Sequence, residues 1–139
     1  MSTTLPGADL EQNERVRAVF EDIRRTRGSD FINAFWRHLA LDPALLEATW
    51  AEVQRTMVAP SALDPLTKEL IYIAVSTANG CGYCVHSHTA AARAKGMTDA
   101  QYADLLAVIG LAGKTNHLAT ALQVPVDPVF DLRQDGGRA

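Results

Sequence analysis

The stretch DPLTKELIYIAVSTANGCGYCVHSHTAAARAKGMT, residues 64–98, carries the clearest helix signals of the chain. Asp64 followed by Pro65 is typical of a helix N-cap and first helical residue, because the aspartate accepts hydrogen bonds from free N–H groups and proline has no N–H. Asn79 and Gly80 are typical of a helix end. The sequence therefore predicts a helix over residues 65–78. A strand over IYIAV is the alternative, but the length of the run and the Lys-Glu pair inside it favour the helix.

Two or three more helices are expected after this one. The next runs from about residue 81 to Gly96. Thr98 and Gln101 have the spacing of a capping box, in which each side chain bonds the backbone N–H of the other residue, and this predicts a helix over residues 99–113. Glycine at the end of that run indicates a break, so a separate short helix is expected over residues 114–122.

The residues upstream repeat the helical periodicity. Apolar positions spaced i, i+3, i+4 and i+7 predict a helix over residues 11–27, ended by Gly28. Ser29 or Asp30 is the expected cap of a second helix, and a third is expected from the Asp-Pro pair at 42–43 to about residue 57. The apolar stripe of the first helix consists of Val16, Val19, Phe20 and Ile23. The aromatic residues expected in the core or in subunit contacts are Phe31, Phe35, Trp36 and Trp50.

These signals, with no strand pattern beside them, predict an all-α fold of about six to seven helices, with the C-x-x-C sequence at the N-terminus of a central helix. A length of 139 residues fits one domain, which we place at residues 9–125. Residues 1–8 and 126–139 are expected to be loosely packed termini.

Composition excludes several classes of function. The chain is 47% hydrophobic and 21% charged, as soluble globular proteins are, and its net charge is −3. Its basic cluster at residues 24–27 adjoins acidic residues, so no nucleic-acid partner is expected. We find neither a secretory signal pattern nor an apolar run of the about 20 residues that a membrane helix needs. We therefore expect no membrane association and a cytoplasmic location, where paired cysteines are more often catalytic or metal-binding than structural.

Both cysteines lie in NGCGYCVHSH, residues 79–88. Cys81, Cys84 and His88 stand at i, i+3 and i+7, so a helix would present them on one face, while His86 points away from that line. Val85 after the second cysteine excludes c-type haem attachment, which needs C-x-x-C-H. Zinc remains an alternative, but a structural site usually needs four ligands. The residues available as a fourth ligand are Glu69, His38 and His117.

Thiol redox chemistry fits this pattern better than zinc. A cysteine in the first turn of a helix feels the positive end of the helix dipole, which stabilises a thiolate. A second cysteine three residues away can trap a sulfenic acid as a disulfide, and His88 can accept or return a proton. Glu69 either stabilises its helix as an ordinary carboxylate or faces inward and orients His88. Disulfide oxidoreductases share these features, so the spacing alone names no substrate.

Glu69, Cys81, Cys84 and His88 together form E-x11-C-x2-C-x3-H, which resembles the core motif of the alkylhydroperoxidase D (AhpD)-like family. That family belongs to the carboxymuconolactone decarboxylase-like superfamily. Two segments carry the resemblance. The family core resembles the segment KELIYIAVSTANGCGYCVHSHTAAARAKGMT, and the N-terminal half of the peroxidase-related members resembles the segment VRAVFEDIRRTRGSDFINAFWRHLALDPALLEATW. The resemblance covers about residues 16–122 and implies a compact, all-α AhpD-like fold.

By this resemblance the chain is an oxidoreductase that acts on hydrogen peroxide or alkyl hydroperoxides. It implies that Cys84 is the peroxidatic thiol, that Cys81 is the proton donor and resolving partner, and that His88 and Glu69 form the proton relay. No metal and no organic cofactor is implied. Electrons would come from a dithiol protein or a lipoyl-type donor. Members of the family are typically homo-oligomers, either dimers or hexamers built as trimers of dimers.

Tyr83 departs from the family pattern. The best-described peroxidase members have a histidine immediately before the second cysteine, and a phenol is a poorer general base at neutral pH than an imidazole. Two alternatives therefore stand beside the peroxidase. One is a reductase of protein or small-molecule disulfides, and the other is a non-catalytic module that senses redox state or a metal. The decarboxylase branch does not as a rule rely on this C-x-x-C, so decarboxylation is the weaker inference.

Overall fold

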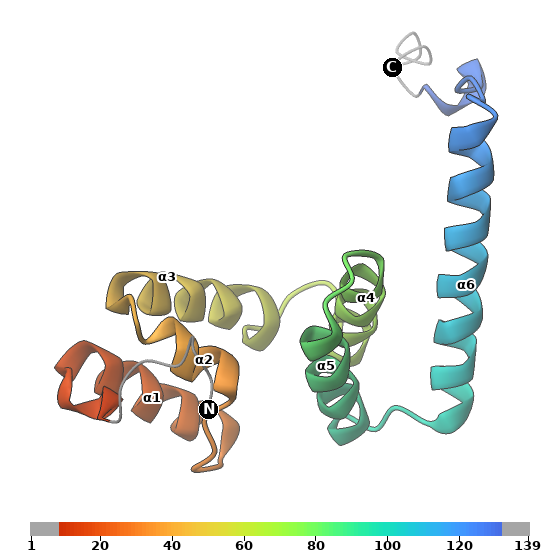
Figure 1. Cartoon of the computed structure of the whole chain (residues 1–139). Coiled ribbons are helices and arrows are strands. Elements are labelled where there is room, and N and C mark those ends of the chain that lie inside the picture. The colour runs from red at the N-terminus through yellow and green to blue at the C-terminus, as the bar shows by residue number, and fades with distance from the viewer. Residues whose placement is uncertain (1–8, 132–139) are drawn as a thin grey trace, which may run out of the picture. The chain divides into compact units, whose positions relative to one another are not determined.

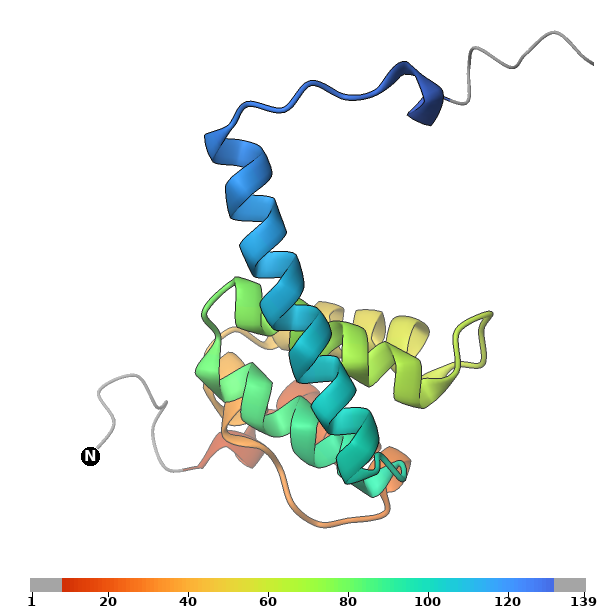
Figure 2. The same ribbon diagram turned by 90° about the vertical axis from the view of Figure 1, so that its right-hand side faces the viewer.

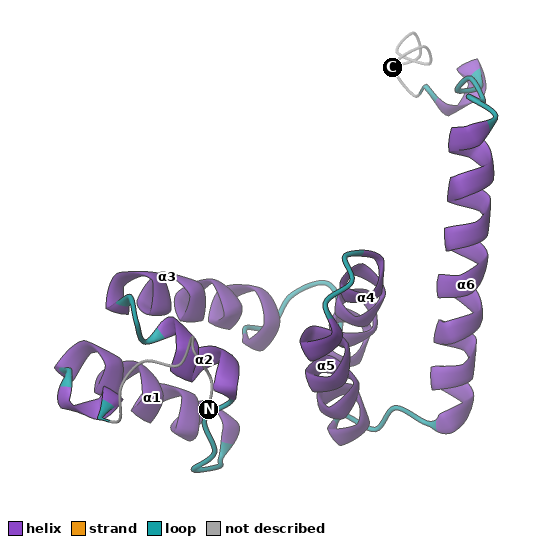
Figure 3. Cartoon of the chain, viewed as in Figure 1, coloured by secondary structure: helices purple, strands orange, loops and turns teal. Residues whose placement is uncertain are grey.

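The structure is a computed structural model and describes residues 9–131. All regular elements in this range are helical, as Figure 3 shows, so the predicted all-α class is confirmed. The α-helices of the described range, labelled in Figure 1, are α1 (Glu14–Arg27), α2 (Ala34–Leu39), α3 (Pro43–Val53), α4 (Pro65–Ala78), α5 (Gly82–Ala94) and α6 (Asp99–Ala121). Shorter helical turns are η1 (Leu10–Gln12), the π-helical η2 (Gln54–Val58) and η3 (Pro128–Phe130).

The helices form two compact units, which divide between Ala62 and Leu63. The first contains α1, α2 and α3, and the second contains α4, α5 and α6. The predicted single domain over residues 9–125 stays a prediction, as do the loosely packed termini. Residues 1–8 and 132–139 lie outside the described range.

The core of the first unit forms around the apolar stripe of α1. Its four predicted members are buried, between 0% and 8% exposed. Trp36 of α2 and Trp50 of α3 pack edge to face, with ring centroids 5.4 Å apart, and both are 4% exposed. The indole N–H of Trp50 donates a hydrogen bond to Asp22 at 2.7 Å, so its buried polar group is satisfied. Burial of each valine, phenylalanine or isoleucine side chain of the α1 stripe contributes about 1.5–3 kcal/mol to stability.

The start of α2 differs from the prediction. Gly28 ends α1 in the left-handed conformation, with φ of 63°, and the helix then begins only at Ala34. Ser29 does not cap α2, because its hydroxyl instead accepts a hydrogen bond from the N–H of Phe31 within the connecting turn. Phe31 is 69% exposed and Phe35 is 44% exposed, so neither belongs to the core of the unit. A role for them in subunit contacts stays a prediction.

In the second unit α4 and α5 pack side by side, as Figures 1 and 2 show. Their buried apolar residues are Ile73 from α4, Ala92 from α5 and Met97 from the loop before α6. Asp64 caps α4 as predicted, since its carboxylate accepts from the backbone N–H of Thr67 at 2.9 Å. Partly buried side chains packed against this core are Leu66, Leu70, Tyr102, Leu105 and Ile109.

The helix α6 begins as predicted but continues where a break was expected. Thr98 and Gln101 form the capping box, with backbone-to-side-chain distances of 2.9 and 3.1 Å. The helix then runs without interruption to Ala121, so the predicted separate helix over residues 114–122 is wrong. A glycine inside a helix costs about 1 kcal/mol relative to alanine, which is too little to end one that good helix formers continue. Although α6 has 23 residues, we find no helix within residues 9–131 that combines the length and apolar character needed to cross a membrane.

Candidate functional site

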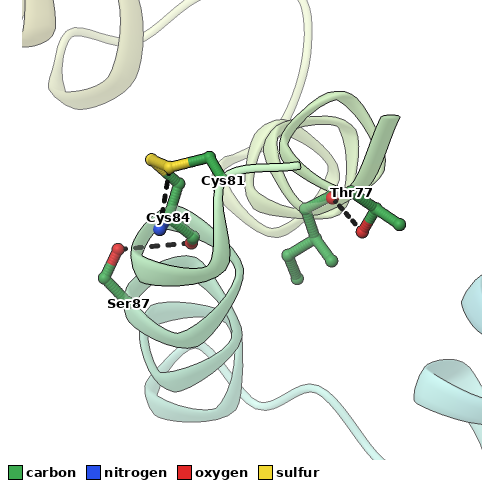
Figure 4. Close-up of a disulfide and its surroundings, with 5 residues drawn as sticks. Thr77, Cys81, Cys84 and Ser87 are labelled. Carbon is green, nitrogen blue, oxygen red and sulfur yellow. Dashed lines mark hydrogen bonds between the residues drawn. A yellow bond between two sulfur atoms is a disulfide. The ribbon is translucent and has the colours of Figure 1, made fainter. Parts of the chain in front are cut away.

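The two cysteines lie where α4 ends and α5 begins (Figure 4). Gly80 adopts the left-handed conformation, with φ of 71°. The N–H of Cys81 bonds the carbonyl of Ser76 at 2.9 Å, and the N–H of Gly80 bonds the carbonyl of Thr77 at 3.1 Å. These two bonds are the 6→1 and 5→2 pair of a Schellman motif, which closes the C-terminus of α4. The turn therefore fixes Cys81 to the end of one helix.

Cys81 is also the N-cap of the next helix, α5. Its sulfur accepts a hydrogen bond from the N–H of Cys84 at 3.2 Å, so the first residue of the C-x-x-C joins the two helix ends. Cys81 and Cys84 form a disulfide, with Cα atoms 5.3 Å apart, and both residues are partly buried. Ser87 donates a hydrogen bond to the carbonyl of Cys84 in the same turn (Figure 4). Cys84 thus lies in the first turn of α5, where the positive end of the helix dipole favours a thiolate after reduction.

Glu69 faces inward from α4 and contacts His88 of α5. Its Oε2 lies 2.7 Å from Nδ1 of His88, and its residue is 5% exposed. The other carboxylate oxygen, Oε1, accepts a hydrogen bond from Nζ of Lys95 at 3.0 Å. The inward orientation of Glu69 is thus the one of its two possible orientations that the structure shows, and Lys95 is a further contact that the motif does not contain.

These contacts decide the ionisation of Glu69. Burial acts to raise the pKa of this carboxyl, but the hydrogen bonds from His88 and Lys95 and the charge of Lys95 outweigh it. The pKa of Glu69 therefore lies below its ordinary value, and the group is a carboxylate at neutral pH. An ionised carboxylate only accepts hydrogen bonds, so Nδ1 of a neutral His88 carries the proton and Nε2 is left as the acceptor.

Tyr72 completes the surroundings of His88. Its ring stacks on the imidazole, with centroids 3.7 Å apart and planes 20° from parallel. From the sequence, Tyr72 is expected to be a packing residue near the motif, and Lys95 is not assigned to the site. Two spacings could have indicated them, since Tyr72 follows Glu69 by three residues on α4 and Lys95 follows His88 by seven at the end of α5.

The contacts described above for Glu69 and His88 include none of the remaining histidines. His86 is on the exposed side of α5, as the helical spacing predicted. His38 belongs to the first unit, where Nδ1 bonds the carbonyl of Ala34 at 2.7 Å, and His117 is exposed on α6. Across residues 9–131 no three side chains of histidine, cysteine, aspartate or glutamate gather closely enough to hold a metal ion. Tyr83, beside Cys84, is 46% exposed.

Comparisons with known proteins identify the family of this chain. A family model described as the carboxymuconolactone decarboxylase family matches residues 43–127, which is more than half of the chain. The crystal structure of an alkylhydroperoxidase AhpD core from Rhodospirillum rubrum is 62% identical, with a TM-score of 0.88, and the match covers 94% of this chain and 97% of that chain.

Two curated relatives are both described as alkyl hydroperoxide reductase AhpD. The relative from Solibacter usitatus is 37% identical over 117 residues, 84% of this chain and 64% of that protein. The relative from Maricaulis maris is 33% identical over 91 residues, 65% of this chain and 51% of that protein. The chain thus spans between about half and two thirds of the length of these relatives.

The solved structure confirms the predicted AhpD-like fold over nearly the whole chain. With the family model matching residues 43–127 as well, this chain belongs to the carboxymuconolactone decarboxylase family and is one of its AhpD-like members.

Proposed function

We propose that the chain is a thiol-dependent peroxidase that reduces hydrogen peroxide or alkyl hydroperoxides through Cys81 and Cys84. The observation that carries this proposal is the contact between the buried Glu69 carboxylate and His88, one helical turn beyond Cys84. A bare C-x-x-C at a helix start suits many redox reactions, whereas an oriented base beside it suits a thiol that must lose its proton. The names of the relatives support a peroxide as substrate.

In the first half of the proposed reaction Cys84 is oxidised. Nε2 of His88 takes the proton of the Cys84 thiol, and the thiolate attacks the terminal oxygen of the hydroperoxide. An S–O bond forms and the O–O bond breaks. The leaving alkoxide takes a proton from the thiol of Cys81, which gives an alcohol and leaves Cys84 as a sulfenic acid.

In the second half Cys81 resolves the intermediate. Its thiolate attacks the sulfur of Cys84, the S–S bond forms, and the hydroxide that leaves takes the proton from His88 and becomes water. The protein has then given two electrons to the peroxide. An external dithiol protein or lipoyl-type donor returns them by disulfide exchange, so the reaction requires no metal or organic cofactor.

Three further expectations belong to this proposal. The relay consists of Glu69 and His88, the protein acts as a homo-oligomer, either a dimer or a hexamer made as a trimer of dimers, and it works in the cytoplasm. The reduction of disulfides remains the second candidate, because Tyr83 stands where a second imidazole would assist peroxide chemistry.

The test uses reduced protein and one equivalent of hydroperoxide, followed by thiol titration and intact mass. Wild type should lose two hydrogen atoms in mass as the disulfide forms. Cys81→Ser should stop at a sulfenic acid that a 1,3-dione reagent traps, and Cys84→Ser should not react quickly. Thiols that survive peroxide but exchange rapidly with a thioredoxin-like disulfide would establish the reductase instead. Thiols that survive and bind one zinc ion would establish a metal module.

A further inference from the structure

We propose that Lys95 is a positioning residue whose charge balances Glu69, so that Glu69 holds His88 in place without drawing a proton onto it. The inference rests on the proposed function, because it concerns the base that would deprotonate Cys84. It concerns a residue for which the motif E-x11-C-x2-C-x3-H has no place.

The geometry divides the carboxylate between two partners. Oε2 of Glu69 lies 2.7 Å from His88, and Oε1 accepts from Nζ of Lys95 at 3.0 Å. The Glu69 side chain is only 6% exposed, so water cannot easily replace either partner. A buried carboxylate oxygen that lost its donor would keep the cost of removal from water. Each oxygen therefore has a different task, one toward the imidazole and one toward the ammonium group.

The charges explain what Lys95 adds beyond a hydrogen bond. When His88 is neutral, the positive charge of Lys95 cancels the negative charge of Glu69, and the three side chains together have no net charge. Without Lys95 the same group would carry one negative charge in a poorly hydrated place. The Glu69–His88 pair would then take up a proton more readily, because interacting groups titrate as a unit whose proton affinity follows the local charge.

Such a proton would stop the proposed reaction. An imidazolium has no free acceptor nitrogen, so it cannot take the proton of the Cys84 thiol. Lys95 therefore keeps His88 available as a base, while the contact with Glu69 still fixes the orientation of the ring. The residue acts through Glu69 and does not itself touch the thiols or a substrate.

The charged groups with the largest effect on the Glu69 carboxylate are Lys95 and His88. The hydrogen-bond partners of the Glu69 side chain among residues 9–131 are His88 and Lys95, both from the α5 side. On α4, the ring of Tyr72 stacks on His88. Arg93, two residues before Lys95, forms an ion pair with Asp99 at the start of α6 at 2.7 Å.

A purely structural reason for Lys95 also exists and must be separated from the proposal. Lys95 is the C-cap of α5, and a cation at a helix C-terminus stabilises the helix through its dipole. That role would change stability in any variant that loses the charge, but it would leave the titration of His88 where it is. The pH at which His88 takes up a proton is therefore the readout that distinguishes the two roles.

The experiment follows the imidazole signals by NMR during a pH titration of the disulfide form, which requires no peroxidase activity. The signal of His88 is assigned by its absence in His88→Asn. In Lys95→Met the midpoint of the His88 titration should move to higher pH by about 0.5–1 unit, a modest shift because the Lys95 side chain is 38% exposed. Lys95→Arg should keep the wild-type midpoint. The matched control is Lys114→Met, which removes the same charge from an exposed position of α6.

The titration and the peroxide assay together test the assignment of Lys95 and the proposed function separately. An unchanged midpoint in Lys95→Met, or an equal shift in Lys114→Met, overturns the assignment of Lys95. If Lys95→Met does not fold, Lys95→Gln replaces it, and the same shift is expected because the charge is gone in both. A clear shift in a protein that consumes no peroxide contradicts the proposed function and leaves the charge balance standing. Peroxide consumption without a shift contradicts the assignment of Lys95 alone.

Discussion

Tyr72 lies flat against the imidazole of His88, with ring centroids 3.7 Å apart and an angle of 20° between the planes. The same helix, α4, supplies Glu69, whose carboxylate fixes Nδ1 of that imidazole at 2.7 Å. One contact sets the direction of the ring nitrogen and the other sets the plane of the ring. A free histidine side chain would rotate, whereas this one has little freedom left.

This arrangement predicts that the aromatic ring of Tyr72 matters more than its hydroxyl group. Aromatic contacts contribute about 0.5–1.5 kcal/mol beyond burial, which corresponds to roughly 2- to 10-fold in a rate. We expect Tyr72→Leu to slow the reaction of Cys84 with hydroperoxide by about that factor, and Tyr72→Phe to stay close to wild type. Stopped-flow measurement of thiol loss tests both variants. Equal rates for Tyr72→Leu and Tyr72→Phe would show that the stacking is incidental.

The buried Glu69 predicts a dependence of stability on pH. Its pKa in the folded state lies below the ordinary value of 4.5, despite the opposing effect of burial, because His88 and Lys95 stabilise the carboxylate. Such a group adds stability that is fully present above the unfolded pKa and is lost as the pH falls through the folded one. The difference in unfolding free energy between wild type and Glu69→Gln should therefore shrink as the pH falls below about 4.5.

Urea unfolding at a series of pH values measures this difference. Glu47→Gln is a suitable control, because Glu47 also pairs with a cation, Arg15, but on the surface of the first unit. Its effect should be smaller than that of Glu69→Gln and should weaken when salt is added. A difference for Glu69→Gln that grows as the pH falls would mean that the carboxyl is stabilised in its protonated form, contrary to the contacts observed.

The pair α4 and α5 could be predicted nearly to the residue, because local chemistry sets its limits. Asp64 caps one end, and the turn at Asn79 and Gly80 needs a left-handed residue that glycine supplies. The start of α2 and the length of α6 could not be predicted in this way. Ser29 has a second use within its turn, and Gly113 is a weak signal that the rest of the helix overrides.

In the candidate site, too, some contacts could be predicted from the sequence and others could not. The contact of Glu69 with His88 could be proposed from the spacing, since an inward carboxylate in an apolar helix needs a partner. Their spacing places Tyr72 and Lys95 near Glu69 and His88, but their contacts could not be assigned, because these depend on how α4 packs against α5. Sequence periodicity defines the face of one helix, but the register between two helices comes from packing.

The cap of α4 is open to a direct test. Asp64 accepts hydrogen bonds from the backbone N–H of Thr67 at 2.9 Å and from its hydroxyl at 2.6 Å. Loss of such a cap typically costs about 1 kcal/mol, so Asp64→Ala should lower the unfolding free energy by that amount and Asp64→Asn by less. Since α4 carries Glu69 and Tyr72, thermal unfolding and the rate of the thiol reaction should be measured together. A variant with unchanged stability would mean that Asp64 does not cap the helix in solution.

The continuity of α6 gives the last prediction, which contrasts two glycines. Gly113 lies inside the helix, and a Cβ added there would meet no atom within 4 Å, so Gly113→Ala should raise the unfolding free energy by about 0.5–1 kcal/mol. Gly80 has equal space around its Cβ position but a φ of 71°, so Gly80→Ala should lower it by about 1–2 kcal/mol. Urea unfolding followed by circular dichroism measures both. Destabilisation by Gly113→Ala as large as that by Gly80→Ala would indicate that the helix does break at Gly113, as the sequence pattern alone suggests.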